Sequence, residues 1–225
     1  MNNKCWYKDV CDRCDSDYCN RDCIRYYKMK YLLDASLLPA SEQYIIKLVA
    51  DEDDKNAYLE LRSIQTDIEK VVEEGKNVLI YSKIPGNGKT SWAKKLMFTY
   101  FDAIWHKCDM EPKALFINVP RMFNELRSNI DKKSEYIAAI KENVLKADLV
   151  VWDEIGVKEL TNFEHDNLLS FVDQRILSNK SNIFTSNLSE DELLPVLGDR
   201  LYSRIVNTSK VIQFKGRDKR ALNKW

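Results

Sequence analysis

The chain has 225 residues, 44% of them hydrophobic and 31% charged, and 35 basic side chains balance 35 acidic ones. This length can bury one globular core with room for a small extra module, and the neutral balance argues against a general polyelectrolyte binder. The sequence has no apolar run of about 20 residues to span a membrane and no secretory signal at its polar start, so we expect a cytoplasmic protein without a membrane partner.

The N-terminal segment is rich in cysteine. Five of the six cysteines fall within the first 23 residues, and in a reducing compartment such clustering favours metal ligation over disulfides. Four thiolates would complete a tetrahedral structural zinc site and would supply folding energy to a segment too short for a core of its own. An iron–sulfur cluster and unligated cysteines are the alternatives. The candidates are Cys5, Cys11, Cys14, Cys19 and Cys23.

A run of acidic residues, DEDDK at Asp51–Lys55, is interpreted as a boundary. Beyond it, apolar residues at helical spacing predict one helix over 56–74, and Gly75 suits the position after its end. The predicted division is therefore a cysteine-rich module at 1–50, a linker helix within 51–75 and a core at 76–225.

From Asn77 onward, short apolar runs alternate with helical patterns. Alternation of this kind predicts an α/β fold in which helices flank a parallel five-stranded sheet. The expected strands are 77–82, 114–119, 148–152, 182–187 and 210–214, and the expected helices lie near 90–107, 120–145, 163–178 and 189–206.

The segment PGNGKT joins the first of these strands to a helix and has the core of a phosphate-binding loop. Two glycines allow consecutive N–H groups to converge on a phosphate at the helix N-terminus. Lys89 can reach the β- and γ-phosphates, and the Thr90 hydroxyl can bind Mg²⁺. The full motif would have glycine at position 83, where this chain has Lys83; a plain Gly-rich turn is the alternative. The predicted ATP contacts are Pro85, Gly86, Asn87, Gly88, Lys89, Thr90, Ser91 and Asp153.

Two other predicted strands end in polar residues. In DLVVWDEIG, Asp153 would hold Mg²⁺ and Glu154 would polarise the attacking water, at the edge of the sheet where the phosphate loop lies. Asn187, after NIFTS, could contact the γ-phosphate or the water. An ordinary solvated loop start is the alternative at both places.

Arginines gather near the C-terminus. Arg200 and Arg204 share one helix face in LGDRLYSRI, and Arg220 ends FKGRDKR. An arginine from a neighbouring subunit can complete a phosphate site and stabilise transition-state charge. Solvated surface arginines are the alternative for any one of them.

The motifs PGNGKT, DLVVWDEIGV, TSN, GDRLYSRI and GRDKR, in this order, resemble the AAA+ core of replicative-helicase loaders of the DnaC and DnaI type, phage or bacterial. The resemblance covers roughly residues 76–225. It implies that Arg204 is an arginine finger acting in trans, that Arg220 is a second sensor and that no separate lid domain follows. It also implies self-association through adjacent ATPase cores.

The resemblance further implies contacts with single-stranded DNA. The segment VKELTNFEHDN matches a DNA-contacting region, where Thr161 could bond a phosphate and Phe163 could stack on a base. A core position is the alternative for Phe163. Arg127 lies in a basic polar segment that could face the DNA, or could be a solvated face.

The N-terminal segment of that family binds the hexameric DnaB-type helicase and carries zinc in several members. Some phage loaders open with a similar CWYK and have four cysteines, which align with Cys5, Cys11, Cys19 and Cys23, with Cys14 as the alternative.

The whole resemblance implies an ATP-dependent loader that helps place the replicative helicase on single-stranded DNA, using ATP hydrolysis as a switch that is slow in isolation. Two alternatives stay open. One is an IstB-like transposition ATPase; the other is a zinc-dependent helicase adaptor or inhibitor with a vestigial ATP site.

Overall fold

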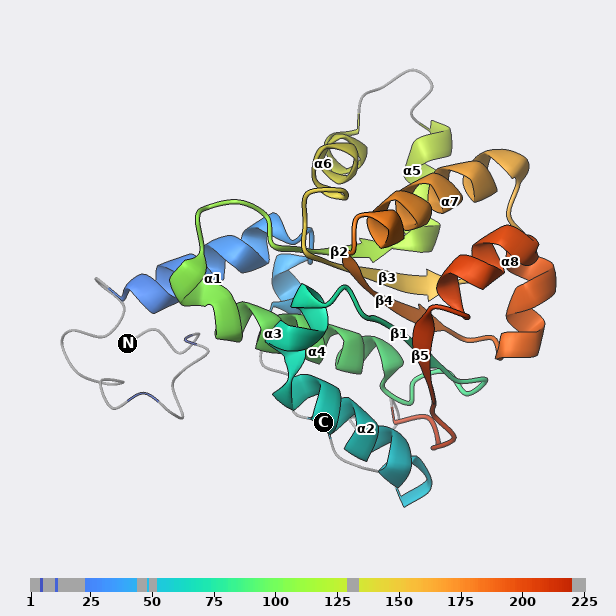
Figure 1. Cartoon of the computed structure of the whole chain (residues 1–225), viewed down its shortest axis with the longest axis horizontal. Helices are drawn as coiled ribbons and strands as arrows, with labels where there is room; N and C mark the ends of the chain where they lie inside the picture. Colours follow the sequence, from blue (N-terminus) through green and yellow to red (C-terminus); the bar gives the residue numbers. More distant parts are fainter. Residues whose placement is uncertain are drawn as a thin grey trace.

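The computed structural model describes residues 5, 11, 23–43, 48, 52–128 and 134–219 (Figure 1). Within them, no helix combines the length and apolar character needed to cross a membrane. The helices are α1 (Ile24–Ala35), α2 (Lys55–Thr66), α3 (Ile68–Glu73), α4 (Lys89–Ile104), α5 (Val119–Ser128), α6 (Glu135–Asn143), α7 (Asn162–Leu177) and α8 (Glu190–Ile205), with short 3-10 helices at Ala40–Glu42, Glu52–Asp54 and Trp105–Lys107.

The five strands form one parallel sheet in the order β2-β3-β4-β1-β5, which confirms the predicted fold class. Continuous apolar runs suit strands that are covered on both faces. The third strand is longer than predicted, because it continues through Asp153 and Glu154 before it ends. The strands are β1 (Asn77–Tyr81), β2 (Ala114–Asn118), β3 (Leu149–Ile155), β4 (Ser181–Ser186) and β5 (Ser209–Gln213).

Alternate residues along each strand point to opposite faces of the sheet, and each face has its own core. On β1, Val78 and Ile80 pack with residues of α1–α4, whereas Leu79 packs with residues of α5–α8. Figure 1 shows these two helical layers on either side of the sheet. The carboxyl ends of all five strands therefore meet at one edge, where a shared site can form.

The predicted helix over 56–74 is divided into α2 and α3 by a break at Asp67, whose φ of −102° and ψ of 21° interrupt the helix. The end at Gly75 is as predicted. Gly75 has a φ of 63°, its N–H donates to Val72, and the Lys76 N–H donates to Val71. This pair of hydrogen bonds is the Schellman arrangement, for which glycine is favoured.

The predicted helix near 120–145 is divided into α5 and α6. The reason lies in Ser134, whose hydroxyl accepts the Ile137 N–H and caps the start of a new helix. The helix near 189–206 is present as α8 but is kinked at Gly198, which has a φ of 72° and a ψ of 160°.

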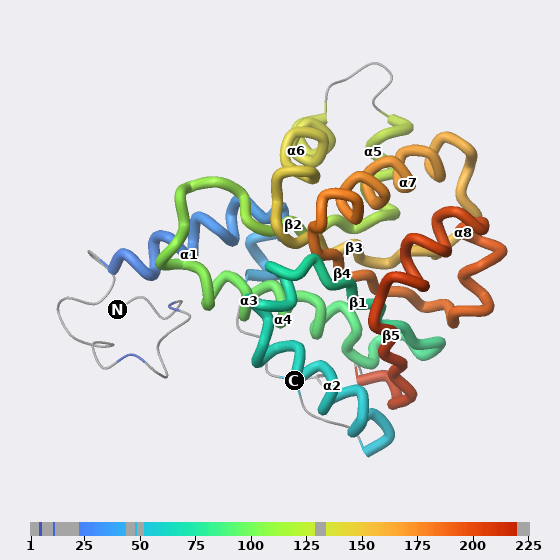
Figure 2. Tube along the Cα trace, viewed as in Figure 1, coloured from blue at the N-terminus to red at the C-terminus, as the bar shows by residue number. Residues whose placement is uncertain are grey.

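The segment before the predicted core packs on it. In α1, Met29, Leu32 and Leu33 are buried in the same core as α4, and the Phe116 N–H on edge strand β2 donates to Ser36. Figure 2 shows α1 running beside the end of α4. The division at residues 50 and 75 stays a prediction, while α1–α3 and α4 share one core.

A buried arginine joins three elements beneath the sheet. Arg175 in α7 is 0% exposed, and its guanidinium donates to the backbone carbonyls of Val144, Ala147, Asp148 and Ser181. Its Nε donates to the Asn182 side chain. Burial lowers the pKa of Arg175. The guanidinium thus links the end of α6 to the starts of β3 and β4 through their backbone carbonyls.

Candidate nucleotide-binding site

The segment between β1 and α4 has the backbone of a phosphate-binding loop. Gly86 and Gly88 have φ values of 72° and 108°, which side-chain-bearing residues rarely adopt, and α4 begins at Lys89 directly after Gly88. The strand, loop and helix follow one another as predicted. The start of α4 thus adds its positive dipole end to the loop, an arrangement that favours anions.

Lysine at position 83 does not strain the loop. Among the described residues other than glycine, positive φ occurs at Leu37, Met110, Glu154 and Asn179, and therefore not at position 83. The Lys83 ammonium lies 2.8 Å from Glu192 in α8. Hydrogen bonding to Lys83, then to Ser189, lowers the pKa of Glu192 to about 2. Lysine in place of the motif's glycine therefore causes no backbone strain, and the Lys83 side chain links the loop to α8 through an ion pair.

The Lys89 side chain is buried within the loop. Its ammonium donates to the carbonyls of Ser82 and Ile84 at 3.3 and 3.2 Å, and to the Asn87 side chain at 3.3 Å. These hydrogen bonds are long for a charged donor, and a phosphate oxygen would be a stronger acceptor. The residue type and its position fit a phosphate group.

Thr90 and Asp153 lie in contact although 63 residues separate them. The Thr90 hydroxyl donates to Asp153 Oδ1 at 2.8 Å, and the Thr185 hydroxyl donates to the same oxygen at 2.8 Å. Asp153 is 4% exposed; burial raises its pKa, and the two hydroxyl hydrogen bonds act in the opposite direction. A buried carboxylate beside a hydroxyl offers the hard oxygen ligands that Mg²⁺ prefers, so these residues fit that ion.

Glu154 has a strained backbone, with a φ of 62° at the point where the β3–β4 register shifts. Residues other than glycine adopt this region at a cost, and such strain gathers at functional sites. The Glu154 N–H donates to Thr185 Oγ1 at 2.9 Å, and Asn118 Nδ2 donates to Glu154 Oε2 at 3.1 Å. The side-chain oxygen of Asn118, Oδ1, accepts the Arg121 N–H at the start of α5, so the Asn118 amide group is itself fixed.

The sequence interpretation missed Thr185 and Asn118. Both occupy strand ends beside the acidic pair, and Asn118 is in register with Asp153 across β2 and β3. Asn118 could have been identified from the sequence, because it is a polar residue at the end of the predicted apolar strand ALFIN. The predicted sensor, Asn187, lies one residue beyond β4, and no side-chain hydrogen bond joins it to the described residues.

Among the predicted arginines that the structure describes, Arg204 is paired within its own chain. Arg204 Nε lies 2.6 Å from Asp173 Oδ1, between α8 and α7. A groove of about 330 Å³ is lined there by Leu169, Asp173, Asp199, Arg200, Ser203 and Arg204. Arg220 falls outside the described residues.

The predicted DNA-contacting residues lie around the start of α7. Thr161 and Glu164 form a capping box, so the Thr161 hydroxyl already has a partner within the helix. Phe163 is 54% exposed, which argues against a core position. Arg127 lies 3.6 Å from buried Glu164, which also accepts Lys158 at 2.9 Å.

The zinc prediction is only partly within the described residues. Cys5, Cys11 and Cys23 are half-buried free thiols, whereas Cys14 and Cys19 fall outside. No group of three or more possible metal ligands occurs in the part of the chain that the structure describes. Zinc ligation therefore stays a prediction.

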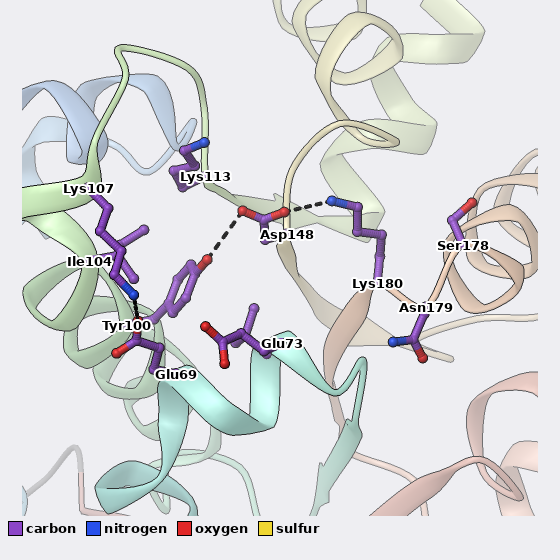
Figure 3. Close-up of a pocket in the computed structure, with 11 residues that line it drawn as sticks. Glu69, Glu73, Tyr100, Ile104, Lys107, Lys113, Asp148, Ser178, Asn179 and Lys180 are labelled. Carbon is purple, nitrogen blue, oxygen red and sulfur yellow. Dashed lines mark hydrogen bonds and ion pairs between the residues drawn. The ribbon is translucent and has the colours of Figure 1, made fainter.

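A cavity of about 400 Å³, shown in Figure 3, lies at the amino ends of three strands, whereas the phosphate loop follows the carboxyl end of β1. Its lining residues Lys113, Asp148 and Lys180 directly precede β2, β3 and β4. Asp148 binds Lys180 at 2.6 Å and Tyr100 at 3.3 Å. Because Lys107 pairs with Glu69 and Lys180 pairs with Asp148 in its lining, we interpret this cavity as structural.

The sheet order, the phosphate loop and the acidic residues beside it define a P-loop AAA+ nucleotide-binding domain. Residues 26–225 match the family model of IstB-like ATP-binding proteins, and the chain belongs to that family. No curated protein sequence matches the chain.

Three solved structures illustrate the shared fold. The DnaC helicase loader is 20% identical with a TM-score of 0.61, over 75% of this chain and 94% of that one. DnaI is 18% identical with a TM-score of 0.57, over 84% of this chain and 93% of that one. Domain III of Thermotoga maritima DnaA is 18% identical with a TM-score of 0.58, over 76% of this chain and 66% of that one. The predicted DnaC/DnaI-type AAA+ fold is therefore confirmed.

Proposed function

We propose that this protein is an ATP-dependent loader that binds the replicative DNA helicase and helps place it on single-stranded DNA. The observation that carries the proposal is the contact between Thr90 of the loop and Asp153 of β3, with Glu154 beside it. The fold shared with a helicase loader supports the choice of partner.

The proposed chemistry is hydrolysis of ATP to ADP and phosphate. Thr90 and Asp153 would hold Mg²⁺, which neutralises phosphate charge when bound, and Lys89 would bind the β- and γ-phosphates. Glu154 would take a proton from a water molecule as the water oxygen attacks the γ-phosphorus and ADP leaves. Asn118 would orient the Glu154 carboxylate. Asn187 would contact the γ-phosphate, and Arg220 would act as a second sensor.

Arg204 would stabilise the transition state on the nucleotide of a neighbouring copy. In the single chain it is paired with Asp173. Isolated subunits should therefore hydrolyse ATP slowly, and assembly through adjacent cores should accelerate hydrolysis. ATP would thus act as a switch, because its hydrolysis would depend on whether the cores are assembled.

The loader proposal is tested by co-purification with a hexameric DnaB-type helicase. We expect the intact protein to form a stable complex through its N-terminal segment, and removal of zinc by chelation to weaken it, because Cys5, Cys11, Cys19 and Cys23, or Cys14 in place of one, would hold the metal. A protein that purifies without zinc and without helicase would contradict the proposal.

Phe163 is expected to carry much of the binding to single-stranded DNA. Stacking on an aromatic ring contributes about 1–3 kcal/mol per base, so Phe163→Ala should weaken binding roughly 5- to 150-fold. Fluorescence anisotropy with an oligonucleotide measures this. Leu177→Ala is the control, because Leu177 is an apolar residue at the other end of α7 and is 73% exposed. Equal effects of the two substitutions would argue against stacking.

A transposition ATPase is the second candidate, and the IstB-like family match is compatible with it. Such a protein should prefer duplex to single-stranded DNA and should act with a transposase. Comparing the two DNA forms in the same anisotropy assay separates the candidates. The intact contacts of Lys89, Thr90 and Asp153 argue against the third possibility, an adaptor with a vestigial ATP site.

A further inference from the structure

We propose that Asp54 is a positioning residue for the nucleotide site, because it anchors the segment 214–219, here called the C-terminal strap, across the phosphate loop. The inference rests on the proposed ATP site and adds to it a residue from the acidic run first interpreted as a domain boundary.

Asp54 is a buried carboxylate, 1% exposed. Its Oδ1 accepts two backbone N–H groups of the strap, Lys215 at 2.7 Å and Gly216 at 2.8 Å. Its Oδ2 lies 3.8 Å from Lys219 Nζ. Burial of a carboxylate is costly unless hydrogen bonds and opposite charge compensate, and here the strap supplies both.

The position of Asp54 in the chain strengthens the inference. Asp54 is the residue before α2, where an aspartate ordinarily caps the helix with its side chain. No such cap is made here, and the carboxylate instead binds amides 161 and 162 residues later. The side chain therefore joins two distant segments rather than its own helix.

The strap contacts the loop directly. It leaves β5 with Phe214, whose N–H donates to the Tyr81 carbonyl at the end of β1, and the Lys219 N–H donates to the Gly86 carbonyl at 3.0 Å. Asp218 packs so closely that a Cβ on Gly86 would lie 1.9 Å from its Oδ1. Figure 1 shows α2 and the chain after β5 approaching the loop between β1 and α4.

These hydrogen bonds connect Asp54 to the phosphate loop through the C-terminal strap. Gly86 has a positive φ, and its carbonyl is held by the strap, which is held in turn by Asp54. Loosening the strap should let the loop amides depart from the arrangement that binds phosphate. ATP affinity should fall, whereas the geometry of Glu154, which belongs to β3, should change little.

The test is the dissociation constant of Mg-ATP, from calorimetry, together with kcat at saturating ATP. We expect Asp54→Ala to raise the dissociation constant about tenfold, with kcat within about twofold of the wild type, because two strap N–H groups lose their acceptor. Asp54→Asn should restore affinity to within about threefold, since one amide oxygen can accept both N–H groups. Asp53→Ala, at the exposed neighbouring acid, should have no effect.

Unchanged affinity in Asp54→Ala, or equal losses in Asp54→Ala and Asp54→Asn, would overturn this proposal without touching the ATP site itself. Lys89→Ala tests that site separately, since wild-type ATP affinity in that variant would count against the proposed function. If Asp54→Ala does not fold, amide exchange of the wild type decides. Mg-ATP should then slow exchange at Lys215, Gly216 and Lys219, and unchanged rates would overturn the proposal.

Discussion

Replacing Glu154 with glutamine should reduce the rate of ATP hydrolysis by about 100-fold or more while leaving ATP binding intact. A general base contributes roughly 10²–10⁴-fold to such a step, and glutamine keeps the size and the Asn118 contact but cannot accept the proton. A phosphate-release assay at saturating Mg-ATP measures the loss. Hydrogen bonds to Asn118 and Thr185 fix the side chain and the backbone of Glu154 in place.

Glu159→Gln is the matched control, because Glu159 is exposed in the loop that follows the same strand. Its rate should equal that of the wild type. Glu154→Gln protein that hydrolyses ATP at the wild-type rate would show that another residue activates the water.

The second large effect is expected on stability. Arg175→Met should lower the free energy of unfolding by about 3–5 kcal/mol, because it removes five hydrogen bonds of the buried guanidinium, four to backbone carbonyls and one to the Asn182 side chain. Urea denaturation followed by circular dichroism measures the change. The loss should be about the same at every pH at which both proteins are folded and the guanidinium is charged.

Arg62→Met provides the comparison, because Arg62 is exposed and its guanidinium donates a long hydrogen bond, 3.4 Å, to Gln65 Oε1. That substitution should change stability by no more than about 0.5 kcal/mol. If Arg175→Met cost no more than Arg62→Met, the buried guanidinium would not be the structural link described here.

Local patterns predicted the elements that carry the chemistry. The apolar runs gave the five strands, the glycine spacing gave the phosphate loop, and Gly75 marked the end of a helix through its own conformation. These features depend on the residues within one segment. Because the carboxyl ends of parallel strands share an edge, the meeting of Thr90 with Asp153 also followed from the motif order.

The features that were missed depend on long-range contacts. The Thr185 hydroxyl contacts both the Asp153 side chain and the Glu154 N–H, at the point where the register of β3 and β4 shifts. No pattern in the sequence predicts such a shift. The acidic run that contains Asp54 was interpreted as a domain boundary, because the partners of Asp54 lie 161 and 162 residues later in the chain. The division of helix 120–145 needed recognition of Ser134 as a cap, and the long polar stretch masked it.

The central claim is that the loop at Pro85–Thr90 and Asp153 together hold ATP and its Mg²⁺. The most direct measurement is a calorimetric titration of Mg-ATP into Glu154→Gln protein, in which bound nucleotide is not consumed. We expect one binding event per chain, lost in Lys89→Ala and weakened at least tenfold when Mg²⁺ is removed with EDTA. No binding to the Glu154→Gln protein, or equal binding with and without Lys89, would contradict the account.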